Sequence, residues 1–267
     1  LSMSNILEAI LLGVIQGLTE FLPVSSSGHL EIFKYIFGYE GTGEQSLLLT
    51  VTLHGATALS TIVVFWKDIW QILKDLFKFE WNQGAKFAAL IVVSMIPAAI
   101  VGLLFEDWLE RLFEGQILLV AMMLILTGVV LWWADQPQSG DRPLGWKQSL
   151  TIGLAQAIAI LPGISRSGAT ISTALLLDID RTKAARFSFL MVLPLIIGKI
   201  LKDLLSGDYT SQSVDGLALV AGSVAAFVVG FVACKWMLAI VKRAQLKYFA
   251  IYCFIVGLLV IGFHMMR

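Results

Sequence analysis

The residues best suited to chemistry lie in two polar segments, each of which interrupts a long apolar stretch. The first segment contains, in order, Gln16, Glu20, Ser25, Ser26, Ser27 and His29. Gln16 and Glu20 share a helix face, and their oxygens are hard ligands that suit Mg²⁺ or Ca²⁺. His29 can act as a nucleophile or as a general acid and base. A carboxylate at membrane depth must be paired, hydrated or metal-bound, so the segment predicts a site in which Glu20 and Gln16 bind a metal or position a water. A hydrogen bond between Glu20 and His29 that closes a helix break is the alternative.

The second segment places an arginine where a helix is expected to restart. It reads Pro-Gly-Ile-Ser-Arg-Ser-Gly and includes Ser165, Arg166, Ser167 and Gly168. The first turn of a helix presents unpaired N–H groups and the positive end of the helix dipole. The guanidinium adds a fork of donors that matches phosphate oxygens. This segment and the serine run of the first segment therefore predict seats for a phosphate-bearing group. An ion pair between Arg166 and a membrane carboxylate such as Glu20 is the alternative.

The elements that position these segments are predicted to be membrane helices. The chain has 267 residues, of which 58% are hydrophobic and 14% are charged, whereas soluble domains are about half apolar and about a quarter charged. The net charge of zero argues against nucleic-acid binding. The two cysteines lack the spacing of a disulfide framework. The function is therefore expected inside the bilayer.

Apolar runs of the length needed to cross a bilayer predict six transmembrane helices. They lie near 47–66, 87–105, 116–134, 187–205, 216–238 and 248–264. Two further stretches, 6–38 and 149–178, are interrupted by the polar segments, and each predicts a re-entrant helical hairpin. Non-helical backbone at membrane depth must be satisfied by protein or water, which makes both interruptions candidate linings of a site. The whole chain, 1–267, is interpreted as one integral-membrane domain.

Charge is distributed unevenly over the predicted connections. Thirteen of the nineteen Lys and Arg residues lie in 67–86, 135–148, 178–186 and 235–247. The alternate connections carry Glu40, Glu44, Glu106, Asp107, Glu110, Glu114, Asp208 and Asp215. Because basic loops stay in the cytoplasm, the acidic connections and both chain ends are predicted to face outward. Hairpin 6–38 then enters from the outer face and hairpin 149–178 from the inner face. The aromatic stretch 67–86 is typical of an amphipathic helix on the inner membrane surface.

A fixed offset of 140 residues relates the two halves of the chain. Gly13, Gln16, Ser25, Ser27 and Gly28 match Gly153, Gln156, Ser165, Ser167 and Gly168. The matches predict an all-α polytopic membrane protein with two repeats, about 6–134 and 149–264, each a re-entrant hairpin plus three transmembrane helices. An odd number of crossings inserts the second repeat upside down. Chance similarity of small-residue helices is the alternative. In the inverted arrangement the hairpin tips meet near the midplane and bring together Glu20, Ser26, His29 and Arg166.

Other residues in the predicted spans carry a weaker signal. His54 stands beside Gly55 in the first span and is interpreted as a packing or hydrogen-bonding residue rather than a ligand. Gly230 and Cys234 have the small-xxx-small spacing of closely packed membrane helices. Neither feature is assigned to the site.

The two polar segments together resemble the motifs of a known family, the bacitracin-resistance type of undecaprenyl-diphosphate phosphatase. The family's (Glu/Gln)-x-x-x-Glu motif corresponds to residues 16–20, and the chain continues Phe-Leu-Pro-Val-Ser-Ser-Ser-Gly-His through 21–29. Its Pro-Gly-x-Ser-Arg-Ser-Gly motif corresponds to 162–168 and is followed by Ala-Thr. The similarity extends through 187–190 to Pro194 and covers essentially the whole chain from Met3 onward.

The resemblance implies a multi-pass enzyme of the bacterial inner membrane that hydrolyses a polyprenyl diphosphate to the monophosphate. It also implies a divalent cation, a site open toward the outer face, a role in recycling the lipid carrier for peptidoglycan, and bacitracin resistance. Carried onto this chain, the functional residues are Gln16, Glu20, Ser26, His29 and Arg166, with Ser25, Ser27, Ser165, Ser167 and Gly168 as phosphate contacts. Gln16 stands where many members have Glu, so Glu20 must carry more of any metal. The sequence leaves a homodimer open.

Two alternatives stay open on the residues alone. His29 is the first choice for the nucleophile, giving a phosphohistidine, and Ser26 deprotonated by His29 is the rival. Their spacing of three residues fits both roles. A transporter or flippase of polyprenyl phosphate lipids, using the same anion seats without hydrolysis, is the non-enzymatic alternative.

Overall fold

The computed structural model describes residues 3–37, 43–113, 115–136, 140–206 and 216–266, and its fold over these ranges is all-α. The helices are α1 (Met3–Phe21), α2 (Ser26–Phe37), α3 (Gly43–Val64), α4 (Trp66–Leu76), α5 (Gln83–Leu104), α6 (Glu106–Phe113), α7 (Ile117–Ala134), α8 (Trp146–Ile158), α9 (Arg166–Leu176), α10 (Arg181–Ser206), α11 (Gly216–Lys242) and α12 (Lys247–Met266). The described ranges contain no β-strand and only isolated bridges of Asp141 and Arg142 with Ile179. The prediction of an all-helical protein is confirmed.

Among the described residues, five helices are long and apolar enough to cross a membrane on their own. They are α5, α7, α11, α12 and, within α10, Arg181–Lys202. A sixth candidate is the pair Leu48–Val64 and Trp66–Leu76, whose helices are bent by 78° at their break. These helices coincide with the six predicted spans, and the protein is a multi-pass membrane protein. The first predicted span differs in shape, because the chain turns at Phe65 and continues as α4.

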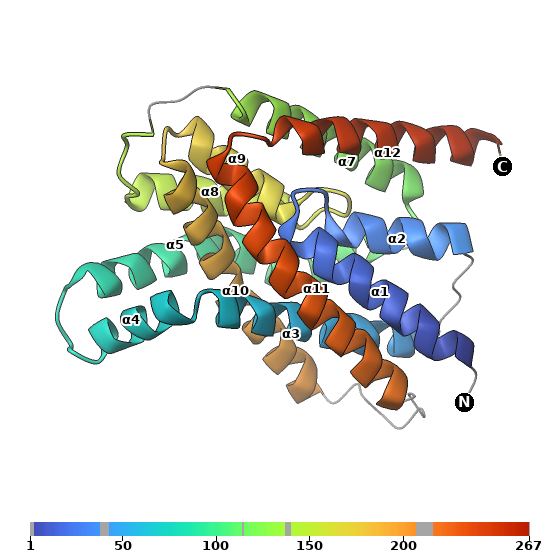
Figure 1. Cartoon of the computed structure of the whole chain (residues 1–267), viewed down its shortest axis with the longest axis horizontal. Coiled ribbons are helices and arrows are strands. Elements are labelled where there is room, and N and C mark those ends of the chain that lie inside the picture. The colour runs from blue at the N-terminus through green and yellow to red at the C-terminus, as the bar shows by residue number, and fades with distance from the viewer. Residues whose placement is uncertain (1–2, 38–42, 114, 137–139, 207–215, 267) are drawn as a thin grey trace.

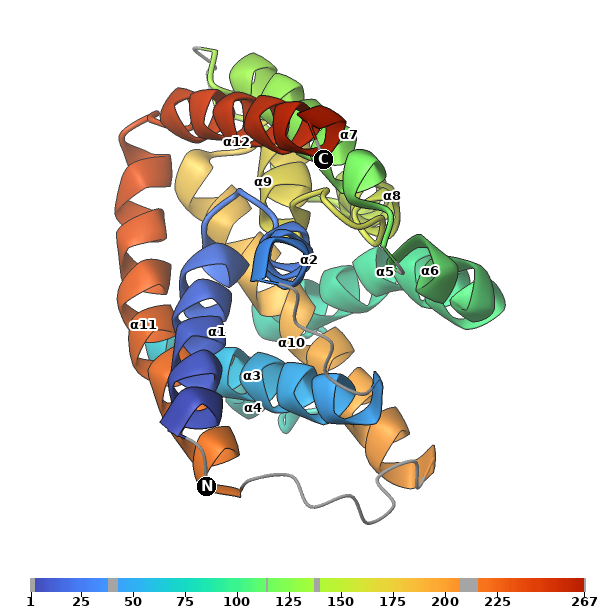
Figure 2. The ribbon, with the colours of Figure 1, turned by 90° about the vertical axis from the view of Figure 1, so that its right-hand side faces the viewer.

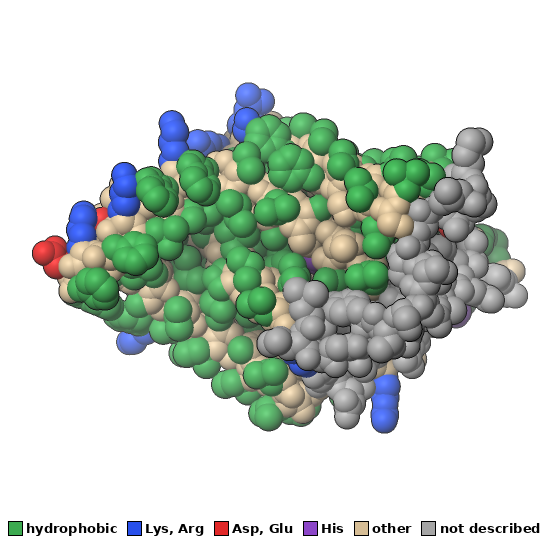
Figure 3. All heavy atoms as spheres, turned by 90° about the horizontal axis from the view of Figure 1, so that it is seen from below, with side chains coloured by type: hydrophobic (Ala, Val, Ile, Leu, Met, Phe, Trp, Pro, Cys, Tyr) green, Lys and Arg blue, Asp and Glu red, His purple; other side chains and the backbone are tan. Residues whose placement is uncertain are grey.

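The surface carries large apolar side chains where a soluble protein would carry charge. Exposed examples are Val92 on α5, Met122 on α7, Val228 on α11 and Leu258 on α12. Hydrophobic side chains cover much of the described part of the face shown in Figure 3, and most of the Lys and Arg side chains visible there lie in its left half. Apolar surface of this extent marks contact with other apolar matter, which for helices of this length is lipid.

The helices surround the two short helices that follow the interruptions. In Figure 2, α2 lies near the centre, with α11 to its left, α12 and α7 above it and α3 below it. In Figure 1, the connections α4–α5, α9–α10 and α11–α12 gather at the left, whereas α1 begins and α12 ends at the right. Three of the four basic connections therefore lie on one side of the molecule, as the charge pattern predicts.

Both interruptions are breaks between two helices. α1 ends at Phe21 before Pro23, and Ser25 adopts a left-handed backbone with a φ of 70° before α2 begins. α8 ends at Ile158, and Gly163 has a φ of 94° before α9 begins. A Cβ added to Gly163 would lie 2.3 Å from the carbonyl oxygen of Val120. Glycine is therefore required at the second break for both its backbone conformation and its small size.

Glycines also let α1 and α8 approach other helices closely. A Cβ on Gly13 would lie 2.2 Å from the carbonyl oxygen of Gly222 in α11, and a Cβ on Gly153 would lie 2.4 Å from that of Ser94 in α5. Small residues let backbones meet in this way in membrane proteins, where packing replaces the hydrophobic effect between helices. The main partner of α1 is accordingly α11, and the main partner of α8 is α5.

The predicted connections contain helices. The stretch 67–86 forms most of α4, in which no residue is buried, and the start of α5. Exposed Trp66 and Trp70 of α4 stack with ring centroids 6.1 Å apart, as suits a helix on a membrane surface. The stretch 106–113 forms α6. The acidic residues predicted to face outward lie outside the described residues or have side chains outside them: Glu40, Glu44, Glu106, Asp107, Glu110, Glu114, Asp208 and Asp215.

Candidate active site

The break between α1 and α2 contacts the break between α8 and α9. Ser167 Oγ donates a hydrogen bond to the carbonyl oxygen of Leu22 at 3.3 Å. A Cβ on Gly28 would lie 3.1 Å from the Cα of Gly163. These contacts join segments about 140 residues apart in the sequence, so the prediction that the two interruptions meet is confirmed.

Serines cap both restarting helices in the same way. Ser25 Oγ accepts a hydrogen bond from the backbone N–H of Gly28 at 3.1 Å, and Ser165 Oγ accepts one from that of Gly168 at 3.0 Å. In each helix the hydroxyl of the serine two residues later lies 3.3 Å from the capping hydroxyl. Each cap satisfies one free donor and leaves the positive end of the helix dipole in place. Two such helix ends meet here, which favours an anion.

Glu20 is the centre of the polar contacts between the two breaks. Its Oε1 accepts a hydrogen bond from Arg166 Nη2. Its Oε2 accepts hydrogen bonds from Ser26 Oγ at 2.9 Å and from Gln16 Nε2 at 3.1 Å. Only 8% of the side chain is exposed, so the carboxylate depends on these donors. The ion pair with Arg166, one of the two alternatives drawn from the sequence, is therefore present.

That ion pair leaves part of the Arg166 guanidinium without a partner. Its Nη1 is buried and has no hydrogen-bond partner among the described residues. An unpaired buried donor is costly and calls for an explanation; a ligand oxygen would supply the missing acceptor. Arg166 also lines a cavity of about 290 Å³. The other polar residues that line the cavity are Thr19, Glu20, Ser26, Ser27, His54, Ser165, Ser167 and Lys199.

His29 lies in α2 but is not among the residues that line this cavity. Its Nδ1 lies 2.8 Å from the carbonyl oxygen of Ser25, which can only accept, so Nδ1 carries the proton. In the neutral ring, Nε2 then accepts a hydrogen bond from the hydroxyl of Tyr252 at 2.8 Å. Of the four residues expected together, the structure thus joins Glu20, Ser26 and Arg166, while His29 bonds to other partners.

His54 and Lys199 line the cavity although the sequence alone assigned neither to the site. His54 Nδ1 donates to the carbonyl oxygen of Thr50 at 2.8 Å, so His54 is a hydrogen-bonding residue as expected. Its Nε2, however, lies 3.9 Å from Glu20 Oε2, and 31% of its side chain is exposed. Both residues are ionisable groups inside predicted spans. An ionisable side chain at membrane depth commonly belongs to a functional site, and this rule could have marked both residues as candidates from the sequence.

The predicted phosphate contacts fall into two groups. Ser27, Ser165 and Ser167 line the cavity. Ser25 and Gly168 do not line it and take part in the helix caps. The contact of all five residues with phosphate stays a prediction.

Glu20 and Gln16, the metal ligands predicted from the sequence, lie in contact with each other. Gln16 Oε1 is buried and has no hydrogen-bond partner among the described residues, and it belongs to the side chain that contacts Glu20. The described residues contain no group of three or more His, Cys, Asp and Glu side chains that could hold a metal. Mg²⁺ is commonly held by one or two carboxylates together with substrate phosphates. Glu20, Gln16 and the substrate would form such a set.

The arrangement suits the transfer of a phosphoryl group. A serine hydroxyl lies against a carboxylate that can take its proton. A guanidinium, a lysine and two helix N-termini surround the same cavity and oppose the negative charge that develops on the phosphoryl oxygens.

Comparison with known proteins agrees with this chemistry. A family model described as bacitracin resistance protein BacA matches residues 9–259. An undecaprenyl-diphosphatase of Christiangramia forsetii is 58% identical over 259 residues, which cover 97% of this chain and 98% of the relative. One of Bacteroides thetaiotaomicron is 49% identical over 260 residues, covering 96% and 97%. One of Caldicellulosiruptor bescii is 39% identical over 264 residues, covering 97% and 98%. The family match includes both breaks and the cavity between them.

Proposed function

The chain belongs to the bacitracin resistance protein BacA family, and we propose that it is an undecaprenyl-diphosphatase. The enzyme hydrolyses undecaprenyl diphosphate to the monophosphate and inorganic phosphate, which returns the lipid carrier to peptidoglycan synthesis and confers bacitracin resistance. The observation that carries this proposal is the partly buried cluster of Ser26, Glu20 and Arg166. The guanidinium Nη1 of Arg166 has no hydrogen-bond partner among the described residues and can donate to a phosphate oxygen.

Ser26 is the nucleophile of the first step. Its oxygen attacks the terminal phosphorus, the bond from that phosphorus to the bridging oxygen breaks, and undecaprenyl monophosphate leaves. The proton of Ser26 passes to Glu20 Oε2, to which its hydroxyl already donates at 2.9 Å. Two observations favour Ser26 over His29 as the nucleophile. Ser26 lines the cavity, whereas the free lone pair of neutral His29, on Nε2, already accepts a hydrogen bond from the Tyr252 hydroxyl.

A water molecule completes the cycle in the second step. Its oxygen attacks the phosphoserine, and the Ser26 oxygen leaves and recovers its proton from Glu20. One proton of the water passes to His54 Nε2, whose ring is oriented by the hydrogen bond of Nδ1 to Thr50. His54, with 31% of its side chain exposed, then releases this proton to solvent. Arg166 and the starts of α2 and α9 stabilise the charge on the phosphoryl oxygens in both steps. A divalent cation held by Glu20 and Gln16 would neutralise further negative charge on the diphosphate.

The fold that holds this site is an inverted repeat of two re-entrant hairpins. The packing of the helices supports this proposal. Helix α1 of the first repeat packs against α11 of the second, and α8 of the second repeat packs against α5 of the first. Gly13 and Gly153, which are 140 residues apart, make the close approach in the two pairs. The identical serine caps of α2 and α9 repeat the same relation. The basic connections face the cytoplasm, and the cavity opens toward the outer face of the inner membrane.

Phosphate release by the purified protein tests the function. We expect inorganic phosphate to be released from undecaprenyl diphosphate, with Glu20→Ala and Arg166→Ala each at least about 10²-fold slower, the usual effect of losing a charge-stabilising or acid–base group. Gln16→Ala should cost less, because Gln16 contacts Glu20 but does not line the cavity. Exposed Arg243, changed to Ala, is the control.

A chelator tests the requirement for a divalent cation, and a transport assay distinguishes the phosphatase from a flippase. Loss of activity with EDTA and its recovery with Mg²⁺ or Ca²⁺ is the result expected for the cation. Near-normal turnover by Arg166→Ala would contradict a site shared by the two breaks. Movement of polyprenyl phosphate across vesicles without any phosphate release would favour a flippase instead.

A further inference from the structure

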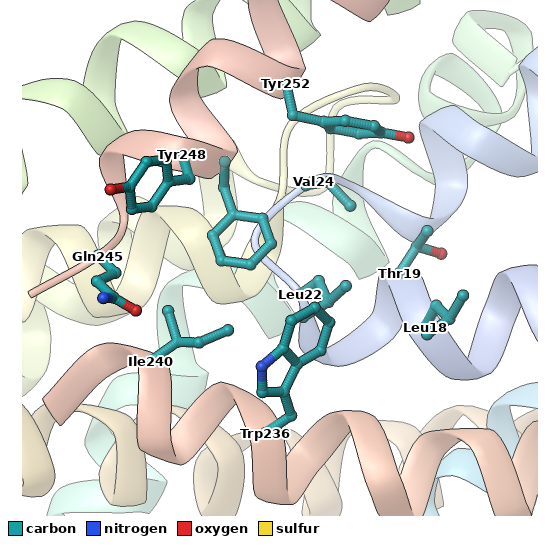
Figure 4. Close-up of a pocket in the computed structure, with 10 residues that line it drawn as sticks. Leu18, Thr19, Leu22, Val24, Trp236, Ile240, Gln245, Tyr248 and Tyr252 are labelled. Carbon is teal, nitrogen blue, oxygen red and sulfur yellow. The ribbon is translucent and has the colours of Figure 1, made fainter. Parts of the chain in front are cut away.

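A second cavity begins beside the candidate active site and is apolar. It has a volume of about 580 Å³ and lies between the end of α1, the end of α11 and the start of α12. Figure 4 shows Thr19 and Tyr252 at one end, Gln245 and Tyr248 at the other, and Leu22 with Trp236 between them. We call this cavity the α11–α12 groove. Its size is typical of ligand sites in proteins.

One residue is shared by the groove and the candidate active site. Thr19 precedes Glu20 and lines both the groove and the cavity that Arg166 lines. Tyr252 lines the groove and donates its hydroxyl to His29, which lies in the first turn of α2 outside that cavity. The apolar groove and the cavity are therefore neighbours on the two sides of Thr19.

The lining is suited to a branched hydrocarbon. Leu18, Leu22, Val24 and Ile240 supply aliphatic contacts along the groove. Trp236 and Tyr248, which are 53% and 59% exposed, supply flat aromatic surface on its wall. Exposed aromatic and aliphatic side chains around a hollow gain free energy when a chain covers them.

We infer that the α11–α12 groove binds the head-proximal isoprene units of the polyprenyl diphosphate; this inference rests on the proposed function. The occupant follows from continuity: the only part of that substrate that adjoins its diphosphate is an apolar chain. The groove leads from the site toward the basic α11–α12 connection (Figure 4). The basic connection is predicted to be cytoplasmic. A lipid whose head group enters the site from the outer face would extend its chain in this direction.

Kinetics with two chain lengths test the inference. In Trp236→Ala we expect the KM for undecaprenyl diphosphate to rise about tenfold, the effect of losing one buried aromatic contact, with kcat unchanged. The kcat/KM for a diphosphate with a single isoprene unit should fall by much less, because its short chain covers less of the groove than the undecaprenyl chain does. Trp133→Ala is the matched control, since Trp133 is 65% exposed on α7 and does not line the groove. Equal losses with both substrates, or no change with either, would overturn the inference.

Photolabelling gives a readout that does not depend on turnover. An undecaprenyl diphosphate with a diazirine in its third isoprene unit should label α11 and α12 around Trp236 and Tyr248. Labelling of the same residues by a diazirine phospholipid, undiminished by excess undecaprenyl diphosphate, would show that bilayer lipid fills the groove and would refute the inference. If the native protein released no phosphate from either diphosphate, the proposed function would fail. The labelling pattern would still decide whether the chain lies in the groove.

Discussion

Two histidines in the helical interior differ in what their second nitrogen faces. Both use Nδ1 to donate to a backbone carbonyl four residues earlier, Ser25 for His29 and Thr50 for His54. Nε2 of His29 lies against Tyr252, whereas Nε2 of His54 faces Glu20 across the cavity. The same local geometry therefore leaves one histidine bonded to Tyr252 and places the other beside Glu20.

The linkage of the phosphoenzyme distinguishes Ser26 from His29. Brief incubation with labelled undecaprenyl diphosphate should trap an acid-stable phosphoserine, because an alkoxide is a far poorer leaving group than a protonated imidazole. The adduct should vanish in Ser26→Ala and persist in His29→Ala, which loses the contacts of His29 with Ser25 and Tyr252. An acid-labile adduct that survives in Ser26→Ala would make His29 the nucleophile.

His54→Ala should slow the second step more than the first. We expect kcat to fall by about 10²-fold, the scale of a lost acid–base group, and the phosphoserine to accumulate after rapid mixing. His264→Ala is the control, because His264 bonds to Tyr35 and does not line the cavity. If the variant loses turnover without accumulating the adduct, His54 does not act on the water.

The helix breaks could be predicted from the sequence, but the partners of the site residues could not. Pro23 and the pair Pro162 and Gly163 stop a helix for local reasons, so the sequence locates both breaks. The contact of His29 with Tyr252 joins residues 223 positions apart, and no local spacing encodes it. In the sequence His54 cannot be distinguished from a packing histidine, because only the folded structure brings Glu20 of α1 beside it.

The helix pairs α1–α11 and α5–α8 depend on glycine where backbones meet. Gly13→Ala and Gly153→Ala should each lower the free energy of unfolding by about 1–3 kcal/mol, since a Cβ there must push two helices apart. Gly102→Ala in α5 should be neutral or slightly stabilising, because nothing lies within 4 Å of its added Cβ. Thermal unfolding in detergent, followed by circular dichroism, measures the difference. Equal melting temperatures for all three variants would contradict the close packing.

The complete bundle has a basic side and an opposite side, and labelling can assign them. A cysteine at Phe79, in the exposed turn before α5, should react with an impermeant reagent from the cytoplasmic face only. A cysteine at exposed Gln116, before α7, should react from the outer face only. The background must lack Cys234 and Cys253, although both are buried. Labelling of both positions from one face would exclude the inverted arrangement.

The packing of each half of the chain against the other also affects the order in which the helices can assemble during synthesis. The ribosome completes α1 first, yet its partner α11 begins only at Gly216. Arg166, the counter-charge of Glu20, is likewise synthesised long after α1. A nascent chain that carried Glu20 into the bilayer early would hold an uncompensated carboxylate there. We therefore expect α1 to reach its final position late in biogenesis. We also expect a chain truncated before α11 to expose an unpaired α1, which insertion factors would retain or proteases remove.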